Sequence, residues 1–162
     1  MRSKLSIQNL AIGGALIGTL FQPAFASDSK VYPGGLCQAT NGKHEVNLFH
    51  GGTTFNNQTS KSGFVRVTCP IVRDSVSGTN GFRAIVNVSR NAQADPNQAL
   101  ICRVSTLRKD GQTFVTRSFS HRGSDTQTFS VRVSPGFSGG PYVMRCDLPF
   151  HSSINSYYIE EL

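Results

Sequence analysis

The 162-residue sequence has no tryptophan, and its nine acidic residues stand against sixteen lysines and arginines. The lack of tryptophan removes the widest aromatic ring on which sugars can stack, which weakens a glycan-binding role without excluding it. The shortage of acids leaves a net charge of +7 at pH 7, which favours anionic partners such as acidic glycans or lipid headgroups. No two of the four cysteines form a C-x-x-C pair, which argues against a zinc knuckle, a thioredoxin-like redox site or a haem attachment site.

The sequence also lacks an apolar run long enough to cross a membrane. Its most apolar run, Leu10 to Phe21, is well short of the roughly 20 residues that a spanning helix needs. A basic start with Arg2 and Lys4 precedes this run, and Ala24-Phe25-Ala26 closes it with small residues. This pattern is typical of a secretory signal peptide, here residues 1–26. We therefore expect an exported protein, periplasmic or extracellular, with no transmembrane segment in its mature chain.

Removal of residues 1–26 leaves 136 residues, a length that suits one domain with one core. The mature chain has 14 lysines and arginines against 9 acids, a net charge of +5 with histidine taken as neutral. Residues 27–43 are rich in Gly, Pro and Ser, and we expect them to form an irregular N-terminal arm. Residues 44–162 are expected to form the folded domain.

Short runs of alternating apolar and polar residues follow the arm, separated by clusters of Gly, Asn, Asp and Ser. Apolar residues at every second position, such as Val65, Val67 and Ile71, are typical of strands with one face in a core. The pattern predicts strands at 44–49, 63–72, 82–89, 99–107, 113–120, 126–133, 141–148 and 154–160. About eight short strands without a convincing helix indicate an all-β fold, a single antiparallel β-sandwich of the jelly-roll or Ig-like kind.

The four cysteines, Cys37, Cys69, Cys102 and Cys146, form an even set behind a signal peptide, which predicts two disulfides. The last three lie on the apolar faces of their predicted strands. That placement favours a Cys102–Cys146 pair between two core-facing strands. Cys37–Cys69 would then tie the arm to the sandwich. The other two pairings of four cysteines remain open.

Arginines occupy the opposite, polar faces of the same strands. They are Arg66, Arg83, Arg103, Arg132 and Arg145. If several lie side by side in one sheet, they form a cationic face suited to phosphate, sulfate or carboxylate groups. The simpler interpretation is an ordinary solvated face. No aromatic residues alternate with the arginines, which disfavours a nucleic-acid partner. The four histidines are scattered, and we expect no metal site and no cofactor.

One short motif, Gly136-Phe137-Ser138-Gly139-Gly140-Pro141, resembles the run around the nucleophile of chymotrypsin-like serine proteases. The resemblance implies Ser138 as the nucleophile, with His50 and Asp74 as its partners. It also implies the Gly136 and Ser138 amides as an oxyanion hole. The sequence around His50 lacks the small-residue run and the adjacent cysteine usual in that family. We favour the simpler interpretation, a glycine-rich turn between strands 127–133 and 142–148.

Residues around the cysteines frame most of the mature chain: Tyr32, Gly34 and Cys37, the run Cys69–Asp74, then Tyr142, Cys146, Leu148 and Pro149, and the run Ser152–Tyr157. This frame resembles a four-cysteine pattern in uncharacterised exported bacterial β-sandwich proteins. The resemblance implies a single exported β domain and brings no activity with it. We expect a non-catalytic binding or envelope-associated role, with an anionic surface or glycan as the candidate partner. The alternative is a small serine hydrolase that uses Ser138.

Overall fold

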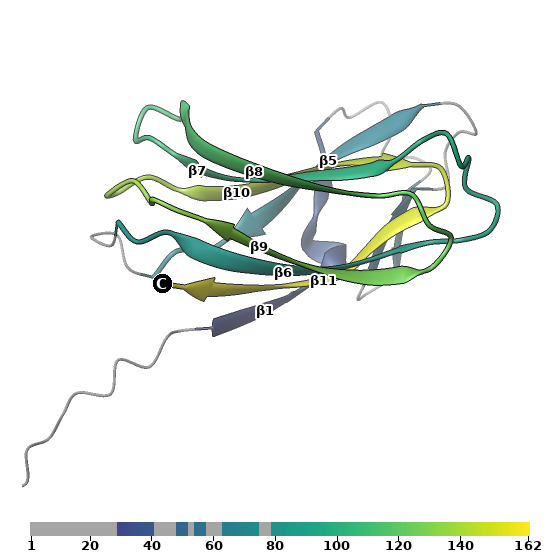
Figure 1. Cartoon of the computed structure of the whole chain (residues 1–162), viewed down its shortest axis with the longest axis horizontal. Helices are drawn as coiled ribbons and strands as arrows, with labels where there is room; N and C mark the ends of the chain where they lie inside the picture. The colour runs from purple at the N-terminus through teal and green to yellow at the C-terminus, as the bar shows by residue number, and fades with distance from the viewer. Residues whose placement is uncertain (1–28, 41–47, 52–53, 58–62, 75–78) are drawn as a thin grey trace, which may run out of the picture.

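A computed structural model describes residues 29–40, 48–51, 54–57, 63–74 and 79–162, with the backbone alone at 48–51 and 54–57. The signal peptide expected at residues 1–26 lies outside this part of the chain. Within this part, no helix is long and apolar enough to span a membrane. The one helix found there is a three-residue 3-10 turn, η1 (Gly34–Leu36), and the remaining regular structure is strand (Figure 1).

The strands of the described chain form two antiparallel sheets that pack face to face (Figure 1). They are β1 (Ser29–Pro33), β2 (Gln38–Ala39), β3 (Leu48–Gly51), β4 (Thr54–Asn57), β5 (Phe64–Ile71), β6 (Phe82–Arg90), β7 (Leu100–Leu107), β8 (Thr113–His121), β9 (Thr126–Val133), β10 (Tyr142–Pro149) and β11 (Ser152–Glu161). The six-stranded sheet has the order β3-β4-β11-β6-β9, with β1 also paired to β11. The five-stranded sheet has the order β2-β5-β10-β7-β8. This is the all-β sandwich that the sequence predicts.

The strand pairs nest around the β7–β8 hairpin. β7 pairs with β8, β6 with β9, β5 with β10 and β4 with β11, all of them antiparallel. Each pair encloses the previous one along the chain, as if one long hairpin had been rolled up so that successive pairs fall in alternate sheets. Eight strands arranged in this way form a jelly roll, so the fold is of the jelly-roll and not of the Ig-like kind.

Seven of the eight predicted strands begin and end within two residues of the observed ones. The eighth, expected at 44–49, overlaps β3, while residues 44–47 lie outside the described part of the chain. The larger difference concerns the arm at 27–43, which we expected to be irregular. It contains β1, η1 and β2, because the edges of β11 and β5 offer unpaired backbone groups to which a short strand can bind.

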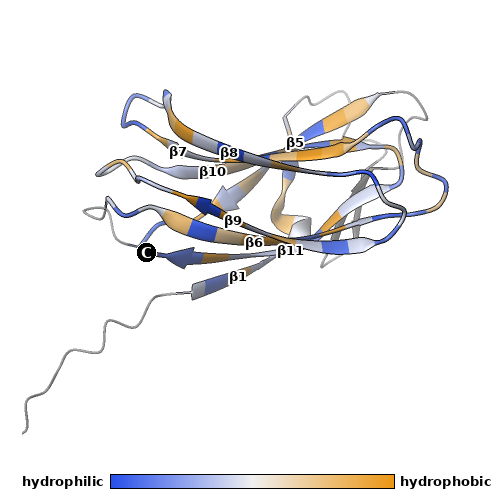
Figure 2. Ribbon diagram, viewed as in Figure 1, coloured by the Kyte–Doolittle hydropathy of each residue, from blue (hydrophilic) through white to orange (hydrophobic). Residues whose placement is uncertain are grey.

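The core lies between the two sheets, where the alternate residues of each strand meet. Buried side chains occupy every second position along β5 and β6, and Figure 2 shows the matching alternation of apolar and polar segments. The largest fully buried side chains include Tyr157, Phe82, Leu100, Met144, Leu148, Ile154 and Ile159. Burial of one such apolar side chain contributes roughly 1.5–3 kcal/mol, so this layer supplies the main driving force for folding.

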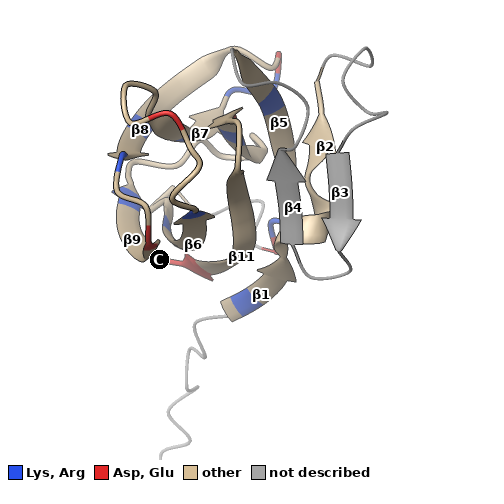
Figure 3. Ribbon diagram, turned by 90° about the vertical axis from the view of Figure 1, so that its right-hand side faces the viewer, with Lys and Arg blue, Asp and Glu red and all other residues tan. Residues whose placement is uncertain are grey.

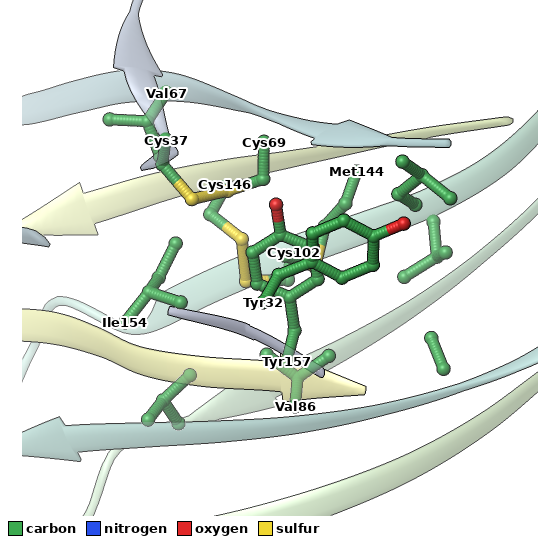
Figure 4. Close-up of a cluster of buried hydrophobic side chains, with 14 of the residues drawn as sticks. Tyr32, Cys37, Val67, Cys69, Val86, Cys102, Met144, Cys146, Ile154 and Tyr157 are labelled. Atoms are coloured by element: carbon green, nitrogen blue, oxygen red, sulfur yellow. A yellow bond between two sulfur atoms is a disulfide. The ribbon is translucent and has the colours of Figure 1, made fainter. Parts of the chain in front are cut away.

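Two disulfides lie in this core (Figure 4). Cys102 in β7 and Cys146 in β10 are directly opposite each other and join neighbouring strands of the five-stranded sheet. Cys37, just after η1, is bonded to Cys69 in β5 and fastens the N-terminal arm to the same sheet. All four cysteines are fully buried. The two pairs are those that the alternation of the sequence favoured.

A stacked pair of tyrosines joins the two sheets. Tyr32 in β1 and Tyr157 in β11 stack with their ring centroids 4.9 Å apart (Figure 4). Both strands belong to the six-stranded sheet, but the tyrosine hydroxyls bind the other sheet. Tyr157 donates to the carbonyl oxygen of Pro70 at 2.6 Å, and Tyr32 accepts from the amide of Val72 at 3.2 Å. Burial, with a smaller effect of Tyr32, raises the pKa of Tyr157, so its hydroxyl remains a donor.

Replacement of both Cys102 and Cys146 by alanine is expected to lower the free energy of unfolding substantially. The disulfide joins residues 44 positions apart, and the chain-entropy estimate for such a loop is about 4 kcal/mol, an upper figure. Urea unfolding of the double variant and the wild type, with Cys37–Cys69 intact in both, measures the difference. An unchanged midpoint would show that this disulfide does not stabilise the fold.

Tyr157→Phe is expected to destabilise the fold by about 1–3 kcal/mol, because the Pro70 carbonyl oxygen then loses its donor inside the sandwich. Tyr158→Phe is the matched control, since the Tyr158 hydroxyl has no hydrogen bond within the described chain and alternation directs the side chain to the outer face. Thermal unfolding of the two variants gives the comparison. Equal losses would contradict the role assigned to the Tyr157 hydroxyl.

Candidate functional site

The five candidate arginines divide between the two sheets and do not form one surface. Arg66, Arg103 and Arg145 lie on the outer face of the five-stranded sheet, in β5, β7 and β10. Arg83 and Arg132 lie opposite each other on the outer face of the six-stranded sheet, in β6 and β9. Figure 3, which looks along the strands, shows the basic segments of β5 and β9 on different walls of the sandwich. Alternation along a strand shows which side chains point outward, but not which sheet the strand joins.

The outer face of the six-stranded sheet is occupied mainly by polar groups that bind one another. Arg83 Nη1 donates to Glu160 Oε2 in β11 at 3.1 Å. Beside this ion pair, Asn155 Nδ2 donates to Asn87 Oδ1 and to Ser89 Oγ, both at 2.6 Å. Arg132, opposite Arg83, is exposed, but Glu160 balances one of these two charges, so the arginines of the five-stranded sheet carry the larger excess of positive charge.

On the five-stranded sheet, one carboxylate joins two of the three arginines. Arg66 Nε donates to Asp147 Oδ1 and Arg103 Nη1 donates to Asp147 Oδ2, each at 2.7 Å. The Asp147 side chain is 12% exposed, against 57% for Arg66 and 46% for Arg103, so the acid is the more buried partner. Burial by itself would raise the pKa of Asp147. The hydrogen bonds and charges of Arg66 and Arg103 outweigh that effect and hold the pKa below its ordinary value.

The third arginine, Arg145, is exposed, and its guanidinium group has no hydrogen bond or ion pair within the described chain. Its register partners are Arg103 in β7 and Thr68 in β5. Like charges directly opposite each other on two strands are unfavourable, and the nearest acid, Asp147, is already shared by two other arginines. We refer to the surface formed by Arg66, Arg103, Arg145 and Asp147 as the arginine face.

Two open depressions border the arginine face. The first, of ≈ 400 Å³, is lined by Phe64, Arg66, Ile101 and Asp147. Phe64 is 47% exposed there and presents an aromatic ring beside the guanidinium groups. The second, of ≈ 360 Å³, lies at the edge strand β2 and is lined by Gln38, Ala39, Thr40, Thr68 and Pro70. Arg66 and Thr68 are alternate residues on one face of β5, so the two depressions adjoin along that strand.

The glycine-rich motif forms a packed turn between β9 and β10, with Ser138 exposed in it. Gly140 lies so close to β7 that a Cβ atom would meet the carbonyl oxygen of Leu107 at 1.8 Å. The amide of Gly136, one of the two candidate oxyanion donors, donates to the carbonyl oxygen of Thr79 at 2.7 Å. Close packing therefore explains why glycine stands at these positions. The Gly136 amide already donates a hydrogen bond within the protein and is not free to bind an oxyanion.

Asp74, the candidate triad acid, is held by other groups. Its carboxylate is bonded to Lys30 of β1, and its amide donates to Glu161 Oε1 at 2.8 Å. The adjacent residue, Arg73, binds the turn itself: Nη1 donates to the carbonyl oxygens of Phe137 and Gly140, both at 2.6 Å. These hydrogen bonds to carbonyl oxygens fix the position of the turn. They do not activate Ser138 as a nucleophile.

His50, the candidate triad base, lies toward the other end of the sandwich, and its side chain is outside the described part of the chain. Its backbone belongs to β3, which pairs with β4, and β4 pairs with β11 at Ile154. The Ser138 turn packs on Gly81, at the end of β11 where the Leu162 amide donates to the Gly81 carbonyl oxygen. Along a strand, Ile154 and Leu162 are about 26 Å apart. The backbone geometry thus does not bring His50 to Ser138.

The described residues contain no group of three or more His, Cys, Asp or Glu side chains that could hold a metal ion. All four cysteines form disulfides and are therefore not available as metal ligands. His121 is buried, with Nε2 3.2 Å from Asp125 Oδ1. The side chains of His44 and His50 lie outside the described part of the chain.

Asp147 of the arginine face and Phe64 of the depression beside it were not among the candidate residues found in the sequence. Asp147 follows Arg145 by two residues on the polar face of a predicted strand, which placed it beside an arginine. Its two partners, however, are 81 and 44 residues away in the chain. Only the strand order β5-β10-β7 brings the three side chains together.

No protein-family model matches the sequence, and no curated protein matches it. The fold is similar to the C-terminal CBM6 of LamC, a marine laminarinase from Zobellia galactanivorans: identity is 11%, the TM-score is 0.55, and the alignment covers 83% of this chain and 100% of that one. A carbohydrate-binding module (CBM6cm-2) from Cellvibrio mixtus lichenase 5A, in complex with cellotriose, gives 6% identity, a TM-score of 0.41, and 67% and 77% coverage. At 11% identity and a TM-score of 0.55, the similarity to the LamC module shows that the two proteins share a β-sandwich fold.

Asp147→Asn is expected to make stability less dependent on acid pH. The folded pKa of Asp147 lies below its ordinary value of 3.8, so its ion pairs stabilise the fold above that pH, and the contribution is lost as pH falls through the folded pKa. Urea unfolding should therefore show the wild type more stable than the variant at about pH 6, with a smaller difference at about pH 2.5. A difference that stays constant with pH would contradict the assignment.

Proposed function

We propose that this protein is a non-catalytic binding module that takes an anionic glycan on the arginine face. The observation that carries the proposal is the exposed, directly opposed pair Arg103 and Arg145. This face carries three guanidinium groups and a single carboxylate, Asp147, which binds two of them, so the face has an excess of two positive charges. A bound carboxylate or sulfate would relieve the repulsion between the opposed arginines and accept forked hydrogen bonds from them.

The surroundings of the arginines favour a sugar over a simple ion. The exposed ring of Phe64 lies in the depression that Arg66 and Asp147 also line. Sugar rings have apolar faces that pack on aromatic side chains, and their carboxylates or sulfates would reach the arginines alongside. The long open surface from β2 to β7 suits an extended chain better than an enclosed small molecule.

Two further features support this proposal. The fold is similar to a module that belongs to a laminarinase, so this kind of sandwich is found in a protein that acts on a glycan. The two disulfides are typical of oxidising compartments, which supports an exported, periplasmic or extracellular site of action where anionic polysaccharides of an envelope or matrix occur. The N-terminal pattern at residues 1–26 supplies the export signal in this proposal.

The test is retention on immobilised heparin, a sulfated glycan, and titration with polygalacturonate, a carboxylated one. Arg103→Gln with Arg145→Gln is expected to weaken binding about tenfold or more, because hydrogen bonds from charged groups are worth a factor of that size. Asp147→Asn is expected to strengthen binding, because it removes the competing acid. Phe64→Ala should weaken binding to polygalacturonate at unchanged net charge.

The matched control is Arg83→Gln with Arg132→Gln, which removes the same two charges from the other sheet. This control is expected to bind nearly as the wild type does. Equal losses in the two double variants would show that retention follows net charge alone and would contradict a site on the arginine face.

A further inference from the structure

The β6–β7 and β8–β9 connections meet at one end of the sandwich, at the right of Figure 1. Residues of both connections line a cavity there. The backbone joins them, since the amide of Arg90 donates to the carbonyl oxygen of Asp125 at 3.0 Å. The cavity measures ≈ 320 Å³ and is lined by Arg90, Asn91, Ala92, Ala94, Pro96, Arg122, Gly123 and Ser124. Two guanidinium groups and no carboxylate line it, and none of its residues belongs to the arginine face.

Arg90 is a buried cation without a carboxylate partner in the described chain. It is 3% exposed. Nη1 donates to the carbonyl oxygen of Arg122, and Nη2 donates to that of Asp95 at 2.7 Å. Its Nε has no hydrogen-bond partner among the described residues. A buried charge held only by neutral acceptors is costly, and an anion nearby would remove much of that cost.

The nearby acids are engaged elsewhere. Asp95 Oδ1 accepts from the amide of Asn97 at 2.8 Å. Asp125 Oδ1 lies 3.2 Å from His121 Nε2, and Asp125 Oδ2 accepts weakly from Gln127 at 3.5 Å. Neither aspartate lines the cavity. Desolvation lowers the pKa of Arg90, and Arg122 lowers it further, while Asp95 has the opposite, raising effect. The charged form of Arg90 is thus only partly compensated in the protein alone.

We infer that this cavity is a second anion-binding site, which takes a single carboxylate, sulfate or phosphate group between Arg90 and Arg122. Arg90 lines the cavity and is fixed by its two carbonyl contacts, so it loses little freedom when an anion binds. Arg122 is exposed and adds a second, adjustable guanidinium. The hydroxyl of Ser124 lines the same cavity and can supply a further donor. The cavity, at ≈ 320 Å³, is smaller than the two depressions at the arginine face, of ≈ 400 and ≈ 360 Å³, which suits one anionic group.

The experiment measures the melting temperature and the amide NMR spectrum of the whole protein with sulfate, phosphate or glucuronate at constant ionic strength, with chloride as the reference. An anion that binds the folded state raises the melting temperature in a saturable manner. We expect saturation with at least one of the three, with shifts at the amides of Gly123 and Ser124. Which anions bind separates inorganic ions from a sugar acid.

Arg122→Gln and Ser124→Asp are expected to weaken this binding about tenfold or more, because one removes a charged donor and the other adds a repelling charge. Both residues are exposed, so these variants are expected to fold. Arg103→Gln with Arg145→Gln should leave the effect unchanged, which separates this site from the arginine face. The inference is overturned if none of the anions gives a saturable effect. It is also overturned if Arg122→Gln responds as the wild type does, or if only the arginine-face variant loses the effect.

Discussion

The register of β10 between its two neighbours determines both the core and the surface of the five-stranded sheet. Inside the sandwich, Cys146 lies opposite Cys102, and the disulfide between them fixes that register. Outside, the same register sets Arg145 opposite Arg103 and places Asp147 between its two arginine partners. A slip of β10 by one residue would turn Cys146 outward and Arg145 into the core. The binding surface is therefore a consequence of the same pairing that holds the core together.

Much of the fold could be predicted from alternation, because burial on one face of a strand imposes a period of two on the sequence. Strands such as β6 and β9 are located within a residue of their predicted ends, and three cysteines fall on the faces expected of them. Alternation is a property of one strand, however, and carries no information about its neighbours. The division of the arginines between two sheets and the contacts of Asp147 depend on strand order, which only the tertiary structure provides.

The Ser138 motif shows the opposite limit of sequence reasoning. Glycines in that run permit an exposed nucleophile in one fold, but here they allow a turn to pack closely on β7 and on the residues before β6. The same glycines can thus meet either of two physical requirements, exposure of a nucleophile or close packing of a turn. The arm at 27–43 has a related explanation, since its glycine and proline content suggests irregular structure while the open strand edges of the sandwich impose pairing on it.

The nested strand pairs also set the length of chain that each pairing encloses. The β7–β8 hairpin joins strands separated by only a short connection, so its loop-closure entropy is small. Once it has formed, β6 and β9 are held near each other, and then β5 and β10, so that each pairing shortens the effective loop of the next. The contacts of β11 with β4 and β1 span the longest stretch of chain, so their loop-closure entropy is the largest of all the pairings. The stacked tyrosines in β1 and β11, and their hydrogen bonds to the other sheet, thus stabilise the pairing whose closure costs the most.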